Sequence, residues 1–248
     1  MERIMTYDNL RYFAYSNDHI CKKPIRGIVR DFWGKDSTGI YHEDTADGIF
    51  YAQQGIVLLI PYYNPWAFCN RQTVAYIEEV LDVFMEHYAL PENIPIVFTG
   101  NSMGGLTALA LTALSKYKPV ACLANCPACD MEDHLYERPG LPHALYSAFG
   151  TYEGTLEEAM LTVSPLHLTD QMPAIPYYVF CGEEDKIVDK KKHSDRFVKK
   201  MRESHTITYY EIPEMGHCKM TETVKQQYLH LAAESILGNT NEDSYGEV

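Results

Sequence analysis

The chain is predicted to form a single α/β domain with a mainly parallel sheet flanked by helices and a small helical cap inserted at about 127–165. Three observations lead to this prediction. Short apolar runs alternate with segments of helical periodicity. The run at 55–60 is continuously apolar, as expected of a parallel strand buried on both faces. A length of 248 residues is enough to bury one large core, so we expect one domain spanning 1–248.

Strands are expected where short runs of apolar residues are bounded by turn residues. In chain order these runs lie at 10–15, 25–32, 55–60, 94–99, 119–124, 175–181 and 206–212. The first of them is interpreted as an edge strand.

Helices are expected between these runs, where apolar residues recur at helical spacing. They are predicted at 71–88, 103–117, 190–203 and 221–237. Residues 127–165 have no strand period and contain four prolines, so we expect them to fold as a cap of short helices. From Gly238 onward the sequence is polar and acidic and is expected to fray.

The charge balance argues against polyanionic partners. The chain has 21 basic and 34 acidic residues and a formal net charge of −13, so neither nucleic acid nor an anionic membrane is expected to bind. No apolar run reaches the roughly 18 residues of a membrane span, and the first eight residues have no apolar signal core. Seven cysteines without a repeating framework fit reduced thiols, which favours a cytoplasmic protein. No nucleotide-binding or zinc-protease motif is present, and no cofactor is predicted.

Residues 100–104 (Gly-Asn-Ser-Met-Gly) match the pattern G-x-S-x-G. They lie between the apolar run and the helical segment that follows it, so a strand must reverse into a helix within a few residues. Side chains at the two glycine positions would clash across such a turn, and the serine would take a strained backbone conformation. Ser102 would then lie at the carboxyl end of the sheet beside a helix N-terminus, which favours a developing oxyanion. The alternative is a turn of small residues around a buried serine.

A serine hydroxyl is a weak nucleophile that needs a base, and the base needs an acid to orient it. In this class of sheet the chain order is serine, then acid, then histidine. Asp185 follows the last strand but one, and His217 follows the last strand. Three other carboxylates near Asp185 compete for its role: Glu183, Glu184 and Asp189. The alternative interpretation of His217 is an exposed loop histidine.

With these motifs the sequence resembles the α/β-hydrolase family, in particular the compact esterases related to dienelactone hydrolase and the catalytic domain of prolyl-oligopeptidase-type enzymes. The resemblance covers about residues 25–237 and rests on the stretches at 100–105, 182–188 and 216–217. It implies that Ser102 is the nucleophile, Asp185 the acid and His217 the base.

The resemblance also implies an oxyanion hole made of two backbone N–H groups. One belongs to Met103, the residue after the nucleophile. The other belongs to Lys35, because Gly34 aligns with the glycine of the family's His-Gly-x loop after an earlier strand. Trp33 stands where the family usually has histidine.

The implied reaction is acyl transfer to water through an acyl-enzyme. A small-molecule carboxylic ester of a small or aromatic acid is the expected substrate. Four aromatic residues are candidates for lining the substrate pocket: Trp33, Tyr62, Tyr63 and Tyr136.

Two alternatives to an esterase stay open. A peptidase or amidase with the same triad is favoured by the acidic cap, which could hold an amino terminus. Peptidases of the prolyl-oligopeptidase type usually carry a large N-terminal domain, whereas 24 residues precede the run at 25–32, which favours the esterase. A non-catalytic binding protein would not need all three triad groups.

Cys126 and Cys129 form a C-x-x-C pair, a pattern found in redox pairs and in halves of zinc sites. Cys181 and Cys218 are expected near the same edge of the sheet, so four thiols could converge. Because no second C-x-x-C is present, we expect small buried thiols and no metal site.

Overall fold

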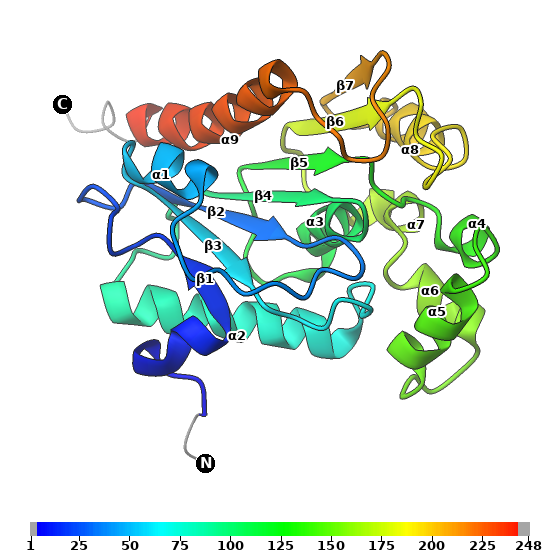
Figure 1. Ribbon diagram of the computed structural model, residues 1–248, viewed down its shortest axis with the longest axis horizontal. Helices are drawn as coiled ribbons and strands as arrows, with labels where there is room; N and C mark the ends of the chain where they lie inside the picture. The colour runs from blue at the N-terminus through cyan, green and yellow to red at the C-terminus, as the bar shows by residue number, and fades with distance from the viewer. Residues whose placement is uncertain (1–3, 243–248) are drawn as a thin grey trace.

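The computed structural model describes residues 4–242, in which seven strands form one sheet (Figure 1). The strands are β1 (Ala14–Ser16), β2 (Gly27–Phe32), β3 (Ile56–Pro61), β4 (Ile96–Asn101), β5 (Ala121–Asn125), β6 (Tyr177–Gly182) and β7 (Ile207–Ile212). Their spatial order is β1-β3-β2-β4-β5-β6-β7. Strand β1 pairs antiparallel with β3, and all other neighbours pair in parallel. The predicted α/β class with a mainly parallel sheet is therefore confirmed.

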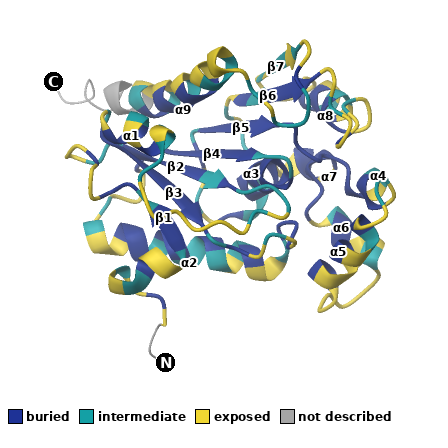
Figure 2. Cartoon of the chain, viewed as in Figure 1, coloured by how far each residue is buried: buried dark blue, intermediate teal, exposed yellow. Residues whose placement is uncertain are grey.

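Helices cover both faces of this sheet because its central strands are apolar on both sides. Every residue of β3 and β5 is buried, and Figure 2 shows the central strands in dark blue. Helices α1 (Ala46–Ala52) and α9 (Glu222–Glu242) pack on one face. Helices α2 (Arg71–Tyr88), α3 (Met103–Leu114) and α8 (Ser194–Met201) pack on the other. Within residues 4–242 no helix combines the length and the apolarity that crossing a bilayer requires.

The segment between β5 and β6 folds as short helices, as predicted for the cap. These helices are α4 (Met131–Leu135), α5 (Leu141–Phe149), α6 (Leu156–Leu161), α7 (Pro165–Leu168) and the 3₁₀ helix η2 (Thr169–Gln171). Pro142 and Pro165 lie in the first turns of α5 and α7, where a missing backbone N–H costs no helical hydrogen bond. Helices α4 to α6 lie beyond the carboxyl ends of the strands, on the right of Figure 1.

The edge strand expected at 10–15 is only partly correct. Strand β1 lies at the edge of the sheet but begins at Ala14, and the 3₁₀ helix η1 (Tyr7–Tyr12) takes the first half of the expected run. Thr6 and Asn9 form a reciprocal capping box that begins this helix, and Leu10 is its only buried residue. Tyr12 is therefore exposed, whereas Tyr15 is buried in β1.

Two predictions about helices also need correction, and one helix was not predicted. The helix expected at 190–203 begins at Ser194, because the amides of Lys192 and His193 donate to the Asp189 carbonyl and form turns instead. Helix α1 was not predicted; it is two turns long and begins at Thr45, whose side chain accepts from the Gly48 amide. The last helix continues to Glu242, so the expected fraying is wrong for 238–242, while 243–248 lie outside the described residues.

Candidate active site

Ser102 occupies the sharp turn between β4 and α3. Its backbone angles, φ 58° and ψ −119°, are strained for a residue with a Cβ atom. Two hydrogen bonds hold it there: its amide donates to the Asn125 carbonyl at 2.8 Å, and its carbonyl accepts from the Leu106 amide at 3.0 Å. The serine side chain is thereby fixed at the carboxyl end of the sheet, directly before the N-terminus of α3.

The two glycines of the motif allow the backbone to pack closely around this turn. A Cβ atom on Gly100 would lie 2.2 Å from the Gly104 carbonyl oxygen. A Cβ atom on Gly104 would lie 1.9 Å from the Phe32 carbonyl oxygen. Any side chain at either position would therefore push α3 away from the sheet and displace Ser102.

The three predicted triad residues form one chain of hydrogen bonds. His217 Nε2 lies 2.8 Å from Ser102 Oγ, and His217 Nδ1 lies 2.7 Å from Asp185 Oδ2. Because a carboxylate only accepts, the Asp185 contact places the single proton of a neutral His217 on Nδ1, and the Nε2 lone pair of that neutral form faces the serine hydroxyl. The structure thus brings together three residues that come from the ends of β4, β6 and β7.

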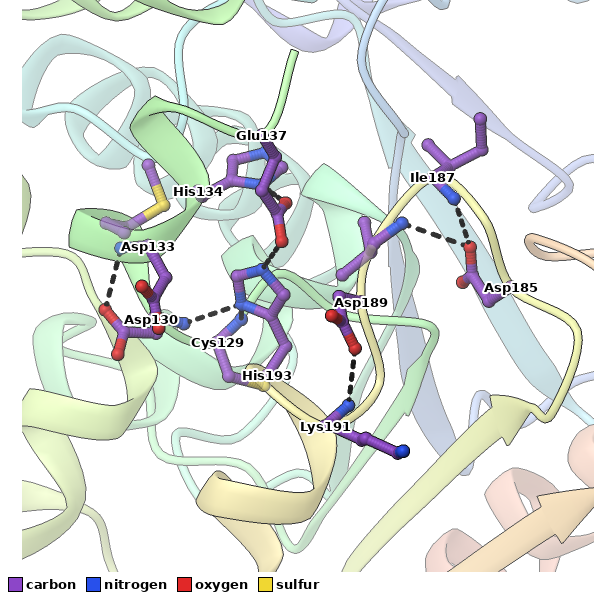
Figure 3. Close-up of polar contacts among 12 residues, drawn as sticks. Cys129, Asp130, Asp133, His134, Glu137, Asp185, Ile187, Asp189, Lys191 and His193 are labelled. Atoms are coloured by element: carbon purple, nitrogen blue, oxygen red, sulfur yellow. Dashed lines mark hydrogen bonds and ion pairs between the residues drawn. The ribbon is translucent and has the colours of Figure 1, made fainter.

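Asp185 is held as an oriented carboxylate. Its side chain is buried, and Oδ1 accepts from the amides of Ile187 at 2.8 Å and Val188 at 3.1 Å (Figure 3). Burial works to raise the pKa of Asp185, but the hydrogen bonds from His217 and these two amides hold that pKa below its usual value.

The three carboxylates that competed for the role of Asp185 are all exposed, whereas the Asp185 side chain is buried. Glu183 and Glu184 are exposed. Asp189 is also exposed and accepts from the Lys191 amide at 3.0 Å (Figure 3).

His217 is electrostatically coupled to Asp185. Burial disfavours the charged imidazole, but the hydrogen bond to Asp185, with a further contribution from Cys126, raises the pKa of His217 to about 9. A raised histidine pKa stabilises the fold fully below about pH 6.5, and this contribution is lost as the pH rises through about 9. The imidazole is therefore mostly protonated at neutral pH.

The structure places the two predicted oxyanion donors only in part. Met103 directly follows Ser102 and is the first residue of α3. Gly34, which precedes Lys35, packs against the turn, where a Cβ atom would lie 3.6 Å from Ser102 Cβ. The assignment of the Met103 and Lys35 amides to an oxyanion hole stays a prediction.

The four aromatic residues proposed for the pocket have different surroundings. The rings of Trp33 and Tyr62 lie 5.1 Å apart, and Tyr41 joins them at 6.0 Å from Trp33. Tyr63 is buried, and its hydroxyl donates to the Trp33 carbonyl at 2.8 Å, so it supports the loop. Tyr136 is 79% exposed at the end of α4.

A cavity of about 490 Å³ adjoins the turn and was not anticipated from the sequence. Asn101, Cys218 and Tyr41 are among the residues that line it, together with Asp31 on β2. Asp31 accepts from the Thr99 hydroxyl at 2.7 Å, and burial raises its pKa to about 7. The signal in the sequence was the charged pair Arg30 and Asp31 inside a strand whose other residues are apolar or glycine.

A buried acid in the cap was also missed. Glu137 accepts from His134 Nδ1 at 2.8 Å and from His193 Nε2 at 3.0 Å (Figure 3). Burial opposes the charge of Glu137, but the two histidine hydrogen bonds hold its pKa well below the usual range. His193 stands at the end of the loop that carries Asp185, so Glu137 ties the cap to that loop.

Known proteins resemble this chain in structure and not detectably in sequence. No family model matches the sequence, and no curated protein matches it. Esterase B from Lactobacillus Rhamnosis is similar with a TM-score of 0.66 and 12% identity over 92% of this chain and 81% of its own.

Two longer proteins are also similar in structure. Puromycin hydrolase has a TM-score of 0.69 and 15% identity over 87% of this chain and 35% of its own. Oligopeptidase B from Leishmania major has a TM-score of 0.66 and 16% identity over 87% of this chain and 34% of its own. The chain therefore spans about a third of the length of these two proteins. From the sheet order, the serine turn and these similarities, the chain has the α/β-hydrolase fold.

Proposed function

We propose that the protein is a serine hydrolase that cleaves carboxylic esters. The observation that carries this proposal is the unbroken chain of hydrogen bonds from Ser102 through His217 to Asp185. Nucleophile, base and orienting acid stand at the distances that proton transfer needs, about 2.6–3.2 Å.

In the proposed reaction His217 Nε2 takes the hydroxyl proton as Ser102 Oγ attacks the ester carbonyl. The carbonyl oxygen becomes an oxyanion, which the N–H groups of Met103 and Lys35 stabilise together with the helix N-terminus. The protonated His217 then gives its proton to the departing alcohol, leaving an acyl group on Ser102. Water attacks the acyl-enzyme by the same proton route and restores the serine. Asp185 holds the imidazole tautomer throughout.

The pH dependence of ester hydrolysis should report the raised pKa of His217. Only neutral His217 accepts the serine proton, and with a pKa of about 9 roughly one part in thirty is neutral at about pH 7.5. We expect kcat/KM to rise about tenfold per pH unit between about pH 6.5 and pH 8.5, and to level off above about pH 9. Initial rates corrected for spontaneous hydrolysis give the profile. A profile already flat at about pH 7.5 would contradict the coupling to Asp185.

A peptidase or amidase remains the second candidate, because two of the structurally similar proteins are named as a peptidase and a hydrolase of puromycin. The triad serves both reactions, so leaving-group chemistry must separate them. An amide leaves poorly and needs protonation by a tightly held base, whereas an ester leaves readily and tolerates looser placement.

The ester proposal is tested by comparing two substrate classes that release coloured products. We expect measurable hydrolysis of short-chain and aromatic p-nitrophenyl esters and far slower cleavage of aminoacyl p-nitroanilides. The comparison uses kcat/KM at one pH above about 9, where His217 is neutral for both substrates. Equal or faster anilide cleavage would favour the peptidase, and no cleavage of either class would favour a binding protein.

A further inference from the structure

Two clusters of metal-ligating side chains occur within residues 4–242, and one of them is closed to a metal ion. In the cluster of His134, Glu137 and His193, the His193 Nδ1 atom accepts from the amides of Cys129 at 3.1 Å and Asp130 at 3.0 Å (Figure 3). The proton of a neutral His193 must therefore lie on Nε2, where it is donated to Glu137. No lone pair is left to face a metal ion from that ring.

The other cluster lies at the proposed catalytic base. The thiols of Cys126 and Cys218 and a ring nitrogen of His217 all lie within 4.8 Å of one another. Cys126 is buried, while Cys218 and His217 are half-buried, so the group is in reach of solvent. Both cysteines hold left-handed backbone conformations, with φ 47° and 55°, which are uncommon for residues with a Cβ atom.

Cys126 lies next to Cys218 and Cys181, and not next to Cys129, its partner in the C-x-x-C pattern. The Cys218 amide donates to Cys126 Sγ at 3.4 Å, and the Cys181 thiol also contacts Cys126. Cys129 instead points its thiol toward the Pro127 carbonyl at 3.6 Å and is fully buried. All seven cysteines are free, so no disulfide occupies the thiols of the cluster.

We propose that Cys126, Cys218 and His217 form a binding site for a thiophilic divalent cation such as Zn²⁺, and that the bound ion switches off the base. The inhibitory part of this proposal rests on the proposed role of His217. The binding part rests only on the cluster.

The donor set suits zinc. A tetrahedral ion with bonds of about 2.3 Å to sulfur and 2.0 Å to nitrogen holds its ligand atoms roughly 3.5–3.8 Å apart, so the three side chains need to close by at most about 1 Å. Two thiolates balance the charge of the ion. Binding releases their two protons to solvent and, below about pH 9, the Nε2 proton of His217 as well. The fourth position is left to water or to Cys181.

Asp185 already orients His217 for such an ion. The carboxylate fixes the proton on Nδ1 and leaves the lone pair on Nε2, which is the arrangement of a metal-bound histidine with a carboxylate partner. An ion on Nε2 replaces the contact with Ser102 Oγ, which stands 2.8 Å away. The serine proton then has no acceptor, so each bound ion removes one working triad.

Binding is measured on the chelator-treated protein by calorimetric titration with Zn²⁺ and by the near-ultraviolet charge-transfer absorption of thiolate-bound Co²⁺. We expect one equivalent of Zn²⁺ to bind with a dissociation constant of about 1 µM or tighter. At about 10 µM free ion, roughly one part in eleven of the protein has no bound ion. The rate of ester hydrolysis should therefore fall about elevenfold and should recover when a chelator removes the ion.

Variants locate the site. Cys126→Ser and Cys218→Ser keep the side-chain size but replace sulfur by a poorer zinc ligand, so each should weaken binding about tenfold or more. Cys21→Ser, which changes a buried thiol in the segment that leads into the amino end of β2, should bind as the wild type does. Ser102→Ala keeps all three ligands and frees Nε2 from the serine, so it should bind Zn²⁺ at least as tightly.

Each result decides one part of the proposal. Wild-type protein that binds no Zn²⁺, a Co²⁺ complex without thiolate absorption, or cysteine variants that bind normally would overturn the site. Full ester hydrolysis by the zinc-loaded wild type would overturn the inhibition. Thermal unfolding shows whether each cysteine variant folds. If one does not, the Co²⁺ spectrum of the wild type and the titration of Ser102→Ala still decide whether the binding site exists. If the wild type binds Zn²⁺ but hydrolyses no ester, the binding site stands and the proposed function fails.

Discussion

Ser102→Ala is expected to lower kcat for ester hydrolysis by about 10⁴-fold or more while leaving the fold intact. The substitution removes the only atom that forms the acyl bond in the proposed reaction. It keeps the Cβ atom, so the strained backbone at φ 58° and the bonds to Asn125 and Leu106 are unchanged. The lost contact to the half-buried His217 costs about 1 kcal/mol of stability at most. Rates on a p-nitrophenyl ester and a thermal unfolding curve measure the two effects.

A chemical probe gives an independent result on the same residue. A serine-directed phosphonate should label the wild type at Ser102 alone, as peptide mass spectrometry would show, and should leave Ser102→Ala unlabelled. A folded Ser102→Ala protein that hydrolyses esters within tenfold of the wild type would remove Ser102 from the mechanism, as would labelling at another serine.

The sheet was predictable because its central strands are buried on both faces. The apolar runs at 55–60 and 94–99 lie within two residues of β3 and β4, and short continuous apolar runs bounded by turn residues are typical of strands buried on both faces. Helix α2 was predicted to the residue, since its apolar stripe packs on the sheet. Short elements failed because capping decides them: η1 depends on Thr6 and Asn9, and α1 on Thr45.

The site was predictable where its chemistry is local in the sequence. The glycines around Ser102 are dictated by contacts of 2.2 Å and 1.9 Å that any Cβ atom would make. The hydrogen bonds among Ser102, His217 and Asp185 fit the roles assigned to those residues, and the roles assigned to Met103 and Lys35 stay predictions.

Contacts between distant segments left no sequence pattern. Glu137 meets His193 across 56 residues, and Cys126 meets Cys218 across 92. Such pairs follow from how the cap and the loops after parallel strands converge at one edge of the sheet.

Asp185→Asn is expected to lower kcat by about 10⁴-fold, close to the effect of removing the nucleophile. The reason is the direction of the two oxygens of Asp185. Oδ1 accepts from the amides of Ile187 and Val188, and only an oxygen can take that position. The carbonyl of the new amide must therefore stay there, which turns the NH₂ group toward His217 Nδ1. The imidazole then carries its proton on Nε2 and cannot accept one from Ser102.

A role of Asp185 as a negative charge alone predicts a different outcome from a role in orienting His217. Matched variants distinguish these two roles. If Asp185 acted only as a negative charge near His217, then Glu184→Gln and Asp189→Asn, which remove a charge from the same exposed loop, should also slow the reaction appreciably. If orientation is decisive, both variants should keep kcat within about twofold, since exposed charges are screened and neither side chain was found to contact the imidazole.

The pH profile of Asp185→Asn gives a second measurement. The substitution removes the carboxylate that raises the pKa of His217, so the midpoint of any residual activity should move below about 9. A folded Asp185→Asn protein within tenfold of the wild type, or an equal loss in Glu184→Gln, would show that another group orients the base.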